Sequence, residues 1–282
     1  MTPDELLTKS QGVLVKTTLV DFPGHVAATY FLKGCNLRCP YCYNVDLVAG
    51  GQTPSTTSDD FKAAGQTPGS SIDNNQTRGQ EVPFSDPASI RYTTPVQVLE
   101  HLYKRRNVIT GLVISGGEPL LNPVTLHLIT RAKSMGLKIK LDTNGTLPLM
   151  LENLFQNPET RPDFVAMDLK TSPDRYKTDI PLTSNFQNAD ISELLKASIN
   201  IIKTLGPSNY EFRTVLVPKL ITKTDIENIA ALLPPDSSWQ FAPFRNENCL
   251  DPSYNNLIPY LDRELKDLVE FAKTLIPGAA LR

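Results

Sequence analysis

The sequence predicts an α/β fold, an open partial (β/α)6 barrel, and three observations support this prediction. Short apolar segments alternate with capped helical segments, and six such β–α units follow one another, which is typical of a parallel sheet covered by helices. Six units are too few to close an eight-stranded barrel. Polar or glycine-rich clusters follow four of the apolar segments, at the sheet edge where parallel β/α proteins gather their chemistry.

The expected strands are short, apolar and bounded by turn residues. They cover Val26–Lys33, Gly111–Ser115, Leu137–Leu141, Phe164–Leu169, Glu211–Val217 and Trp239–Ala242. The expected helices begin at capping signals such as Thr94-Pro95-Val96-Gln97, which offers an N-cap, a proline at the first helical position and a capping-box glutamine. They cover Pro95–Arg106, Leu121–Met135, Leu147–Phe155, Asp190–Leu205, a segment capped by Thr224-Asp225-Ile226-Glu227, and Tyr260–Leu275.

Residues 49–90 depart from this regular pattern. Gly, Ser, Thr, Gln, Asn and Pro dominate the segment, so it cannot bury enough apolar surface to offset its ordering entropy. We therefore expect a single domain over residues 1–282, with 49–90 as a flexible insertion within one loop. The insertion is either a spacer without function or a flap that contacts a partner.

Composition narrows the class of protein. Apolar residues make up 40% of the 282-residue chain, which supports a substantial core, and the net charge of −2 gives no electrostatic case for a nucleic-acid or membrane-surface partner. The polar, acidic start Met1–Glu5 lacks the apolar segment of a secretory signal. The chain has 4 cysteines, and we expect a cytoplasmic protein in which clustered cysteines serve as metal ligands rather than disulfide partners.

Three cysteines lie in one short loop after the first expected strand. Cys35, Cys39 and Cys42 have the spacing C-x3-C-x2-C. If they hold a four-iron cluster, one iron lacks a protein ligand and is open to a substrate or cofactor, whereas an electron-carrying cluster normally has four cysteines. Zinc is the alternative, with His25 or Cys249 as the fourth ligand, although Cys249 is more simply read as a buried structural thiol.

The cysteine loop and the turn Ser115–Pro119 together resemble the radical S-adenosylmethionine (SAM) superfamily, and the resemblance extends from about Gly12 to Arg245 apart from the insertion. Within it the chain resembles the activating enzymes of glycyl-radical proteins, above all the anaerobic ribonucleoside-triphosphate reductase activating proteins. One departure is Tyr43, where these relatives commonly have His. The resemblance to these activating proteins lies in five sequence segments, Lys16–Gly24, Gly34–Cys42, Val113–Pro119, Leu141–Gly145 and Met167–Lys170.

The resemblance implies a fold of the radical SAM type and the reductive cleavage of SAM at an iron–sulfur cluster. Cys35, Cys39 and Cys42 would hold three irons of a [4Fe–4S] cluster, and SAM would bind the fourth iron through its amino and carboxylate groups. One electron would cleave SAM to methionine and a 5′-deoxyadenosyl radical, which abstracts a hydrogen atom. The implied partners are a glycyl-radical enzyme as protein substrate, an anaerobic ribonucleotide reductase in the first instance, and a flavodoxin or ferredoxin as electron donor.

Several SAM contacts follow from the resemblance near the first two turns. Gly116 and Gly117 would let the backbone approach the methionine end of SAM, and Glu118 would accept a hydrogen bond from its ammonium group. An ordinary strand-to-helix loop is the alternative for this turn. Tyr41 would pack near the adenine, unless it is simply a core aromatic.

Further contacts are expected at the next strand ends. Asp142, Thr143 and Asn144 carry small oxygen-bearing side chains that suit a ribose or a cation associated with the SAM carboxylate. Asp168 and Lys170 are two residues apart and so share one face of a strand; Lys170 would neutralise the carboxylate of SAM, and a surface ion pair is the alternative.

Arg213 and Asp21 complete the candidate site. Arg213 is a lone charge in an apolar strand, which predicts an inward anionic partner, and we expect SAM. Asp21, in the turn before the first strand, would lie on the side of the incoming glycine by resemblance, and a plain turn is the alternative. Two other functions stay open, a radical SAM enzyme acting on a small molecule and a non-catalytic zinc or electron-transfer module.

Overall fold

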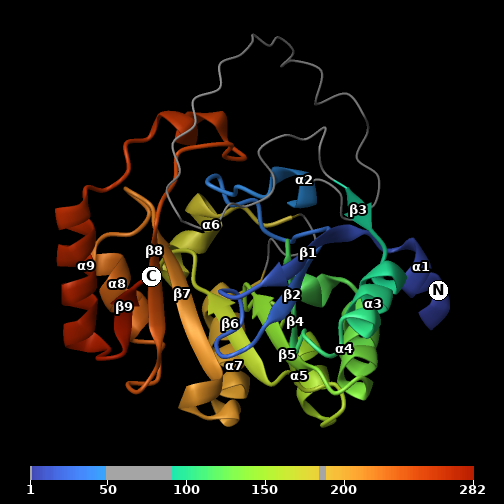
Figure 1. Ribbon diagram of the computed structural model, residues 1–282. Coiled ribbons are helices and arrows are strands. Elements are labelled where there is room, and N and C mark those ends of the chain that lie inside the picture. Colours follow the sequence, from blue (N-terminus) through green and yellow to red (C-terminus); the bar gives the residue numbers. More distant parts are fainter. Residues whose placement is uncertain (1, 49–90, 184–188) are drawn as a thin grey trace, which may run out of the picture.

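The computed structural model describes residues 2–48, 91–183 and 189–282, and it confirms the α/β fold with an open, mostly parallel sheet (Figure 1). Nine strands of these segments form one sheet in the order β3-β1-β2-β4-β5-β6-β7-β8-β9. All neighbours from β2 to β9 are parallel, and β1 is antiparallel to both β2 and β3. The strands are β1 Gly12–Thr18, β2 Ala27–Leu32, β3 Tyr92–Thr93, β4 Gly111–Gly116, β5 Lys138–Thr143, β6 Phe164–Asp168, β7 Tyr210–Leu216, β8 Trp239–Pro243 and β9 Ala279–Leu281. The six expected strands are present, and β1, β3 and β9 were not expected.

Helices cover the outer face of this sheet. They are α1 Pro3–Lys9, α2 Val45–Val48, α3 Pro95–Lys104, α4 Val124–Ser134, α5 Pro148–Phe155, α6 Tyr176–Asp179, α7 Ile191–Ile202, α8 Lys223–Ala230 and α9 Asp262–Leu275. The capping box at Thr94 forms as expected, with Gln97 at N3. The expected insertion at 49–90 lies outside the described residues.

Two helix starts differ from the expectation. A short 3₁₀ turn occupies Pro119–Leu121, and α4 begins only at Val124, because Pro123 occupies its N-cap position. The cap of α8 is Thr222 rather than Thr224. The Thr222 hydroxyl accepts from the backbone N–H of Asp225 while the Asp225 carboxylate accepts from the Thr222 N–H, and this reciprocal pair fixes the start two residues earlier.

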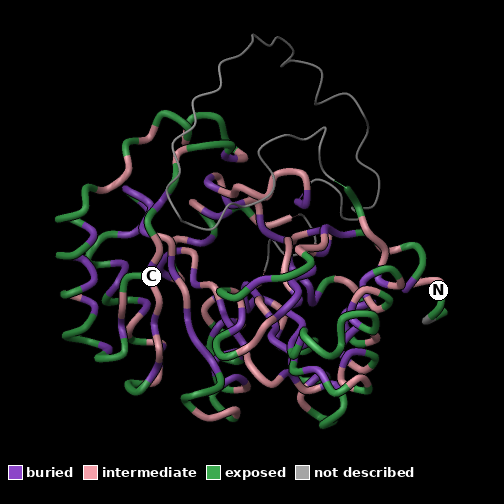
Figure 2. The backbone as a smooth tube through the Cα atoms, in the orientation of Figure 1, coloured by how far each residue is buried: buried purple, intermediate pink, exposed green. Residues whose placement is uncertain are grey.

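The sheet is buried on both faces, as parallel sheets are. In Figure 2 the residues coloured as buried follow the central strands. Leu112 and Ile114 of β4 belong to the main core under the helices. The side chain between them, Val113, lies in a second small cluster with Phe22 and Ala27. Alternation therefore gives the sheet a concave face that is apolar at the amino ends of the strands and polar further along.

Strand register brings the polar clusters together at the carboxyl edge. Leu32 at the end of β2 pairs with Gly116 at the end of β4, and Asp168 of β6 pairs with Arg213 of β7. The cysteine loop and the turns after β4, β5 and β6 therefore meet at one edge, as the sequence predicts. In the described part of the chain, no helix has the length and apolar character needed to cross a membrane.

Candidate functional site

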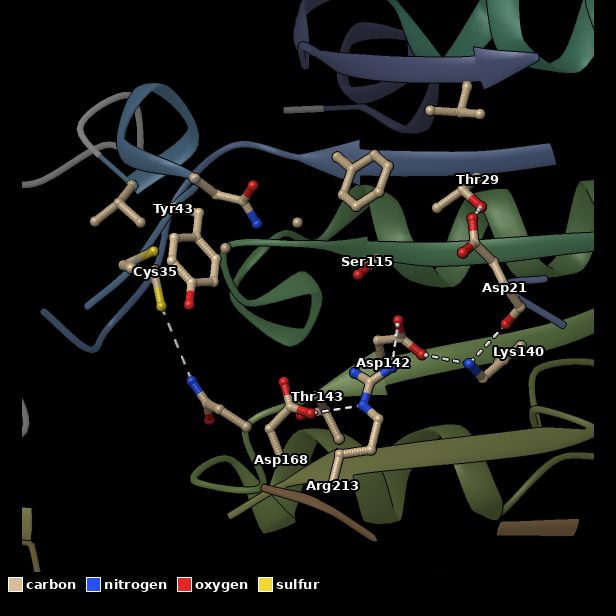
Figure 3. A pocket seen from close by; sticks show the side chains of 18 of the residues that line it. Asp21, Thr29, Cys35, Tyr43, Ser115, Lys140, Asp142, Thr143, Asp168 and Arg213 are labelled. Carbon is tan, nitrogen blue, oxygen red and sulfur yellow. Dashed lines mark hydrogen bonds and ion pairs between the residues drawn. The ribbon is translucent and has the colours of Figure 1, made fainter. Parts of the chain in front are cut away.

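A pocket with a volume of about 450 Å³ lies on the concave face of the sheet. Figure 3 shows Cys35 at one end of it, with Asp21, Thr29 and Lys140 at the other. We call these the cysteine end and the Asp21 end. Most of the expected site residues line the pocket, namely Asp21, Cys35, Cys39, Cys42, Gly116, Gly117, Asp142, Thr143, Asn144, Asp168, Lys170 and Arg213, while Tyr41 and Glu118 do not.

The cysteine loop is held by hydrogen bonds from distant parts of the chain. The Gly34 N–H donates to the Leu47 carbonyl over 2.7 Å, and the Arg38 N–H donates to the Pro181 carbonyl over 2.7 Å. The Arg38 guanidinium turns back and donates to the Cys35 carbonyl. These bonds fix the loop before any ligand is present.

The two glycines of the turn after β4 allow two backbones to touch. A Cβ atom on Gly117 would lie 2.1 Å from the Gly34 carbonyl oxygen, and one on Gly116 would lie 2.2 Å from the Leu32 oxygen. Gly116 also has a φ of +127°, a conformation that L side chains rarely adopt. The glycines are therefore required for the contact between this turn and the cysteine loop.

Glu118 lies behind the pocket wall and is fully buried. Its Oε1 accepts from the Leu120 N–H and the Thr143 hydroxyl, and its Oε2 accepts from the Asn144 N–H. Burial raises the pKa of this carboxyl to about 7 although these three hydrogen bonds act to lower it. The structure thus assigns its acceptor oxygens to the turn after β5 rather than to the pocket where we expected it to meet the ammonium of SAM.

A ring of neutral side chains connects the turn after β5 with the cysteine loop. The Asn144 amide donates to the Asn36 Oδ1 and lies 4.0 Å from the Cys35 sulfur. The Asn36 amide donates to the Thr146 hydroxyl over 2.7 Å, and that hydroxyl donates to the Asn144 Oδ1 over 2.6 Å. Asn36, Asn144 and Thr146 are all buried, so the ring is closed and shielded from water.

A row of opposite charges crosses the middle of the pocket (Figure 3). Arg213 Nε donates to Asp168 over 2.7 Å, and its Nη1 donates to Asp142 over 3.2 Å. Lys170 pairs with Asp168 over 2.9 Å, and Lys140 lies 3.3 Å from Asp142. Asp168 and Lys170 do share one face, as expected, and their side chains are only 27% and 21% exposed inside the pocket, so the pair does not lie on the outer surface.

The charges in this row shift one another's pKa values. Burial alone would raise the pKa of Asp168, but Arg213 and Lys170 outweigh it and hold that pKa well below its usual range. Burial likewise opposes the charge on Lys170, whose pKa is nevertheless raised, chiefly by Asp168 and then by Cys39. Asp168 and Lys170 therefore stay ionised across the physiological range.

The three thiols lie in a setting that suits metal ligation. Burial raises the pKa of Cys35 to about 11 and raises the pKa values of Cys39 and Cys42, while Lys170 acts to lower all three. Thiolates here need a positive partner beyond Lys170, which bound iron would supply with release of protons.

Neither residue proposed as a fourth zinc ligand lines the pocket with the three cysteines. His25, one proposed fourth zinc ligand, packs on Phe22 and contacts the Thr110 hydroxyl. The Cys249 thiol faces the Arg245 carbonyl and does not line the pocket.

The two tyrosines of the loop differ in position. Tyr41 is buried in the core and its hydroxyl lies 3.4 Å from the Lys170 carbonyl, in agreement with the core alternative rather than with a position along the pocket. Tyr43 lines the pocket, its hydroxyl accepts from the Arg245 N–H over 2.6 Å, and its ring stacks on Phe244. The tyrosine that replaces the usual His therefore ties the loop to the segment after β8.

Three charged residues near the Asp21 end were not anticipated. Lys140 lies within β5, Glu211 within β7 and Arg282 directly after β9, and Lys140 and Arg282 line the pocket. Lys140 lies two residues before Asp142 in β5, and Glu211 lies two residues before Arg213 in β7, so strand alternation places each beside a residue that was already a candidate. Nothing in the local sequence points to Arg282.

Comparisons with known proteins agree with this geometry. Residues 29–218 match the sequence profile of the Radical SAM superfamily. A Methanocaldococcus jannaschii protein, provisionally named a glycyl-radical enzyme activating enzyme, is 28% identical over 95% of this chain and 94% of its own length. The crystal structure of QueE from Escherichia coli superposes with a TM-score of 0.50 at 14% identity, covering 100% of this chain and 97% of QueE. A TYW1 structure with a lysine–pyruvate adduct gives a TM-score of 0.50 at 12% identity, over 88% of this chain and 73% of TYW1.

Proposed function

Because the chain belongs to the radical SAM superfamily, we propose that it is an activating enzyme that places a radical on a backbone glycine of an anaerobic ribonucleoside-triphosphate reductase. Membership makes it an enzyme that uses a [4Fe–4S] cluster and SAM. The observation that carries the finer proposal is the end-to-end match to the Methanocaldococcus jannaschii protein. That match covers nearly the whole of both chains and is not confined to the cofactor-binding loops.

The cysteine end has the residues to hold the cofactors. Cys35, Cys39 and Cys42 would hold three irons, and the Asn144 amide and the Leu37 N–H, which lies 3.4 Å from the Cys35 sulfur, would stabilise the thiolate at Cys35. When bound, the cluster and SAM supply one electron, a sulfonium bond that cleaves, and the 5′-deoxyadenosyl radical that removes the glycine hydrogen.

The middle of the pocket would bind the charged end of SAM. Lys170, two residues after β6, lies close enough to the three cysteines to act to lower the pKa of each thiol. Its ammonium and the Arg213 guanidinium would pair with the SAM carboxylate. Gly116, Gly117 and Asn144 would contact the methionine portion, and Asp142 and Thr143 the ribose.

The Asp21 end would receive the glycine segment of the target. The Asp21 carboxylate accepts from the Thr29 hydroxyl over 2.6 Å and lines the pocket. A carboxylate held in this way can accept from a backbone N–H of an entering peptide. We further propose a cytoplasmic location with a flavodoxin or ferredoxin as electron donor, since the thiols need a reducing compartment.

The proposal is tested by anaerobic reconstitution with iron and sulfide, followed by reduction in the presence of SAM and the candidate reductase. We expect a glycyl radical in the electron paramagnetic resonance (EPR) spectrum of the reductase, together with 5′-deoxyadenosine. Reductase made with α-deuterated glycine should change the hyperfine splitting and deliver deuterium to 5′-deoxyadenosine.

Two other outcomes would contradict the proposal at different levels. Cleavage of SAM with no radical on the reductase would remove the proposed partner and favour a small-molecule substrate. A colourless zinc protein that never forms 5′-deoxyadenosine would remove the cofactor assignment itself.

A further inference from the structure

We propose that Lys140, Glu211 and Arg282 are positioning residues that together clamp the β1–β2 loop across the open side of the barrel, and thereby fix Asp21 in the pocket. The three residues will be called the loop clamp. Its role in placing the target rests on the proposed function; its role in fixing the loop does not.

Lys140 is the buried member of the loop clamp. Its side chain is 1% exposed, and a charge taken out of water is retained only where several partners compensate it. Its ammonium group donates to the Asp21 carbonyl over 2.7 Å and lies 3.3 Å from Asp142 and 3.6 Å from Glu211. One lysine thus connects the β1–β2 loop with two strands of the sheet.

Arg282 approaches the same loop from the other side. Its backbone N–H donates to the Phe241 carbonyl, so it continues the β9 register beside β8. Its Nη2 donates to the Val20 carbonyl over 3.1 Å, and its Nη1 lies 4.0 Å from Glu211 Oε1. Lys140 and Arg282 therefore share one carboxylate and hold adjacent carbonyls of one loop.

The loop clamp bridges strands that do not pair with one another. β1 and β2 lie on one side of the sheet order and β8 and β9 on the other; in Figure 1 the blue hairpin of β1 and β2 extends toward the orange β7. No pairing of backbone strands joins β1 to β9 in the described residues. Side-chain ion pairs and two carbonyl hydrogen bonds take the place of that pairing.

The loop is held from its amide side as well. The Thr18 hydroxyl accepts from the N–H groups of Val20 and Asp21, each over 3.3 Å. The Leu19 and Val20 side chains stay 74% and 53% exposed, whereas Phe22, on the other side of Asp21, is buried in the small cluster with Val113. Phe22 therefore anchors one side of Asp21, and carbonyl and amide contacts hold the exposed side, where the loop clamp supplies the carbonyl half.

Hydrogen exchange of the apoprotein and holoprotein tests the loop clamp directly. In Arg282→Gln, the amides of residues 19–25 should exchange about tenfold faster than in the wild type, because one charge-assisted hydrogen bond and one ion pair are lost. Arg282→Lys should restore part of the protection. Arg263→Gln makes the same chemical change on the exposed face of α9 and should leave the loop unchanged.

Kinetics of the holoprotein separate positioning from a general loss of structure. With the reductase as target, Arg282→Gln should raise KM for the reductase about tenfold, while SAM cleavage without target stays within about twofold of wild type. Lys140→Met should speed exchange of residues 19–25 further, because it removes the buried member.

The outcomes distinguish the loop clamp from the proposed function. Unchanged exchange at residues 19–25 in both Arg282→Gln and Lys140→Met would overturn the loop clamp. It would also be overturned if Arg282→Gln lost SAM cleavage without target to the same extent as it lost activity on the reductase. Failure of the wild type to place a radical on the reductase would overturn the proposed function alone, since the exchange measurements still decide whether the loop is held in this way.

Discussion

The two ends of the pocket are built by different kinds of interaction. At the cysteine end, backbones touch at Gly34 and Gly117, and neutral side chains close a buried ring through Asn36 and Asn144. At the Asp21 end, the charged side chains of the loop clamp hold two carbonyls of a loop whose Leu19 and Val20 side chains remain in solvent. One end relies on steric fit and the other on charge.

The difference between steric contacts and charged contacts determines how rigidly each end of the pocket is held. Close-packed backbones and satisfied buried hydrogen bonds have few alternative arrangements, which suits thiols that must keep one geometry for an inorganic cluster. In the loop clamp only Arg282 is substantially exposed, at 38%, so its interaction with Glu211 weakens with salt while the buried Lys140 keeps its contacts. The Asp21 end should therefore be more sensitive to salt than the cysteine end.

The largest expected effect is at the cysteine end. Cys39→Ser should reduce SAM cleavage to the background without enzyme, because a serine hydroxyl does not replace a thiolate on iron. The thermal unfolding midpoint of the apoprotein should change little, since the loop is held by backbone hydrogen bonds. Cys249→Ser is the matched control and should retain cleavage; full activity in Cys39→Ser would refute the ligand assignment.

A second large effect is expected where the two ends meet. Arg213→Met removes the shared partner of Asp142 and Asp168, and the free energy of unfolding should fall by about 2–3 kcal/mol, less than for a fully buried pair because Arg213 is partly exposed. Chemical denaturation of the apoprotein measures this. Lys196→Met breaks the exposed pair with Glu193 and should change the same quantity by no more than about 0.5 kcal/mol; equal losses in the two variants would contradict the contrast between pocket and surface.

A smaller effect concerns the one titratable carboxyl behind the cysteine end. The pKa of Glu118 is raised to about 7 by burial, so the folded protein keeps a proton that the unfolded chain loses near its ordinary pKa of about 4.5. Folding stability should therefore fall as pH rises from about 5 to 8, by an amount of order 1–3 kcal/mol.

Glu118→Gln serves as the comparison, since its side chain does not titrate. The variant will be less stable overall, because its amide group faces donors, but the fall in its unfolding free energy over the same pH range should be shallower. Parallel slopes for wild type and Glu118→Gln would show that Glu118 is ionised throughout and that the donors from the turn after β5 outweigh burial.

The smallest effect is expected from a deletion within residues 49–90, which lie outside the described residues. Deletion of residues 50–81 should leave SAM cleavage intact if the insertion is a spacer. Loss of 5′-deoxyadenosine formation in the deletion variant, with iron content unchanged, would show that the segment contributes to the pocket chemistry.

The sequence predicted the parallel sheet well because its strands are buried on both faces and read as continuous apolar runs. It did not reveal β3 and β9, which are two and three residues long and carry too little pattern to detect. β1 was missed because its burial does not alternate from residue to residue, and Lys16 and Thr17 are both in solvent.

The site could be predicted only where local spacing determines it. The cysteine loop and the pair Asp168–Lys170 follow from short spacings and strand alternation. Glu118 was placed toward the pocket because nothing local shows that its oxygens are already taken by Thr143 and Asn144, about 25 residues away. Arg282 could not be found at all, since its contact with Val20 depends on how the two sides of the sheet meet.

The cysteine loop is supported by a segment that lies about 200 residues later in the chain. Leu250 and Asp251 donate their N–H groups to the carbonyls of Cys42 and Pro40, and Arg245 donates to the Tyr43 hydroxyl. A ribosome therefore releases the three thiols long before it has synthesised the residues that complete their cradle. The loop that the folded protein offers to a cluster is therefore complete only once residues 245–251 have been synthesised and have folded against it.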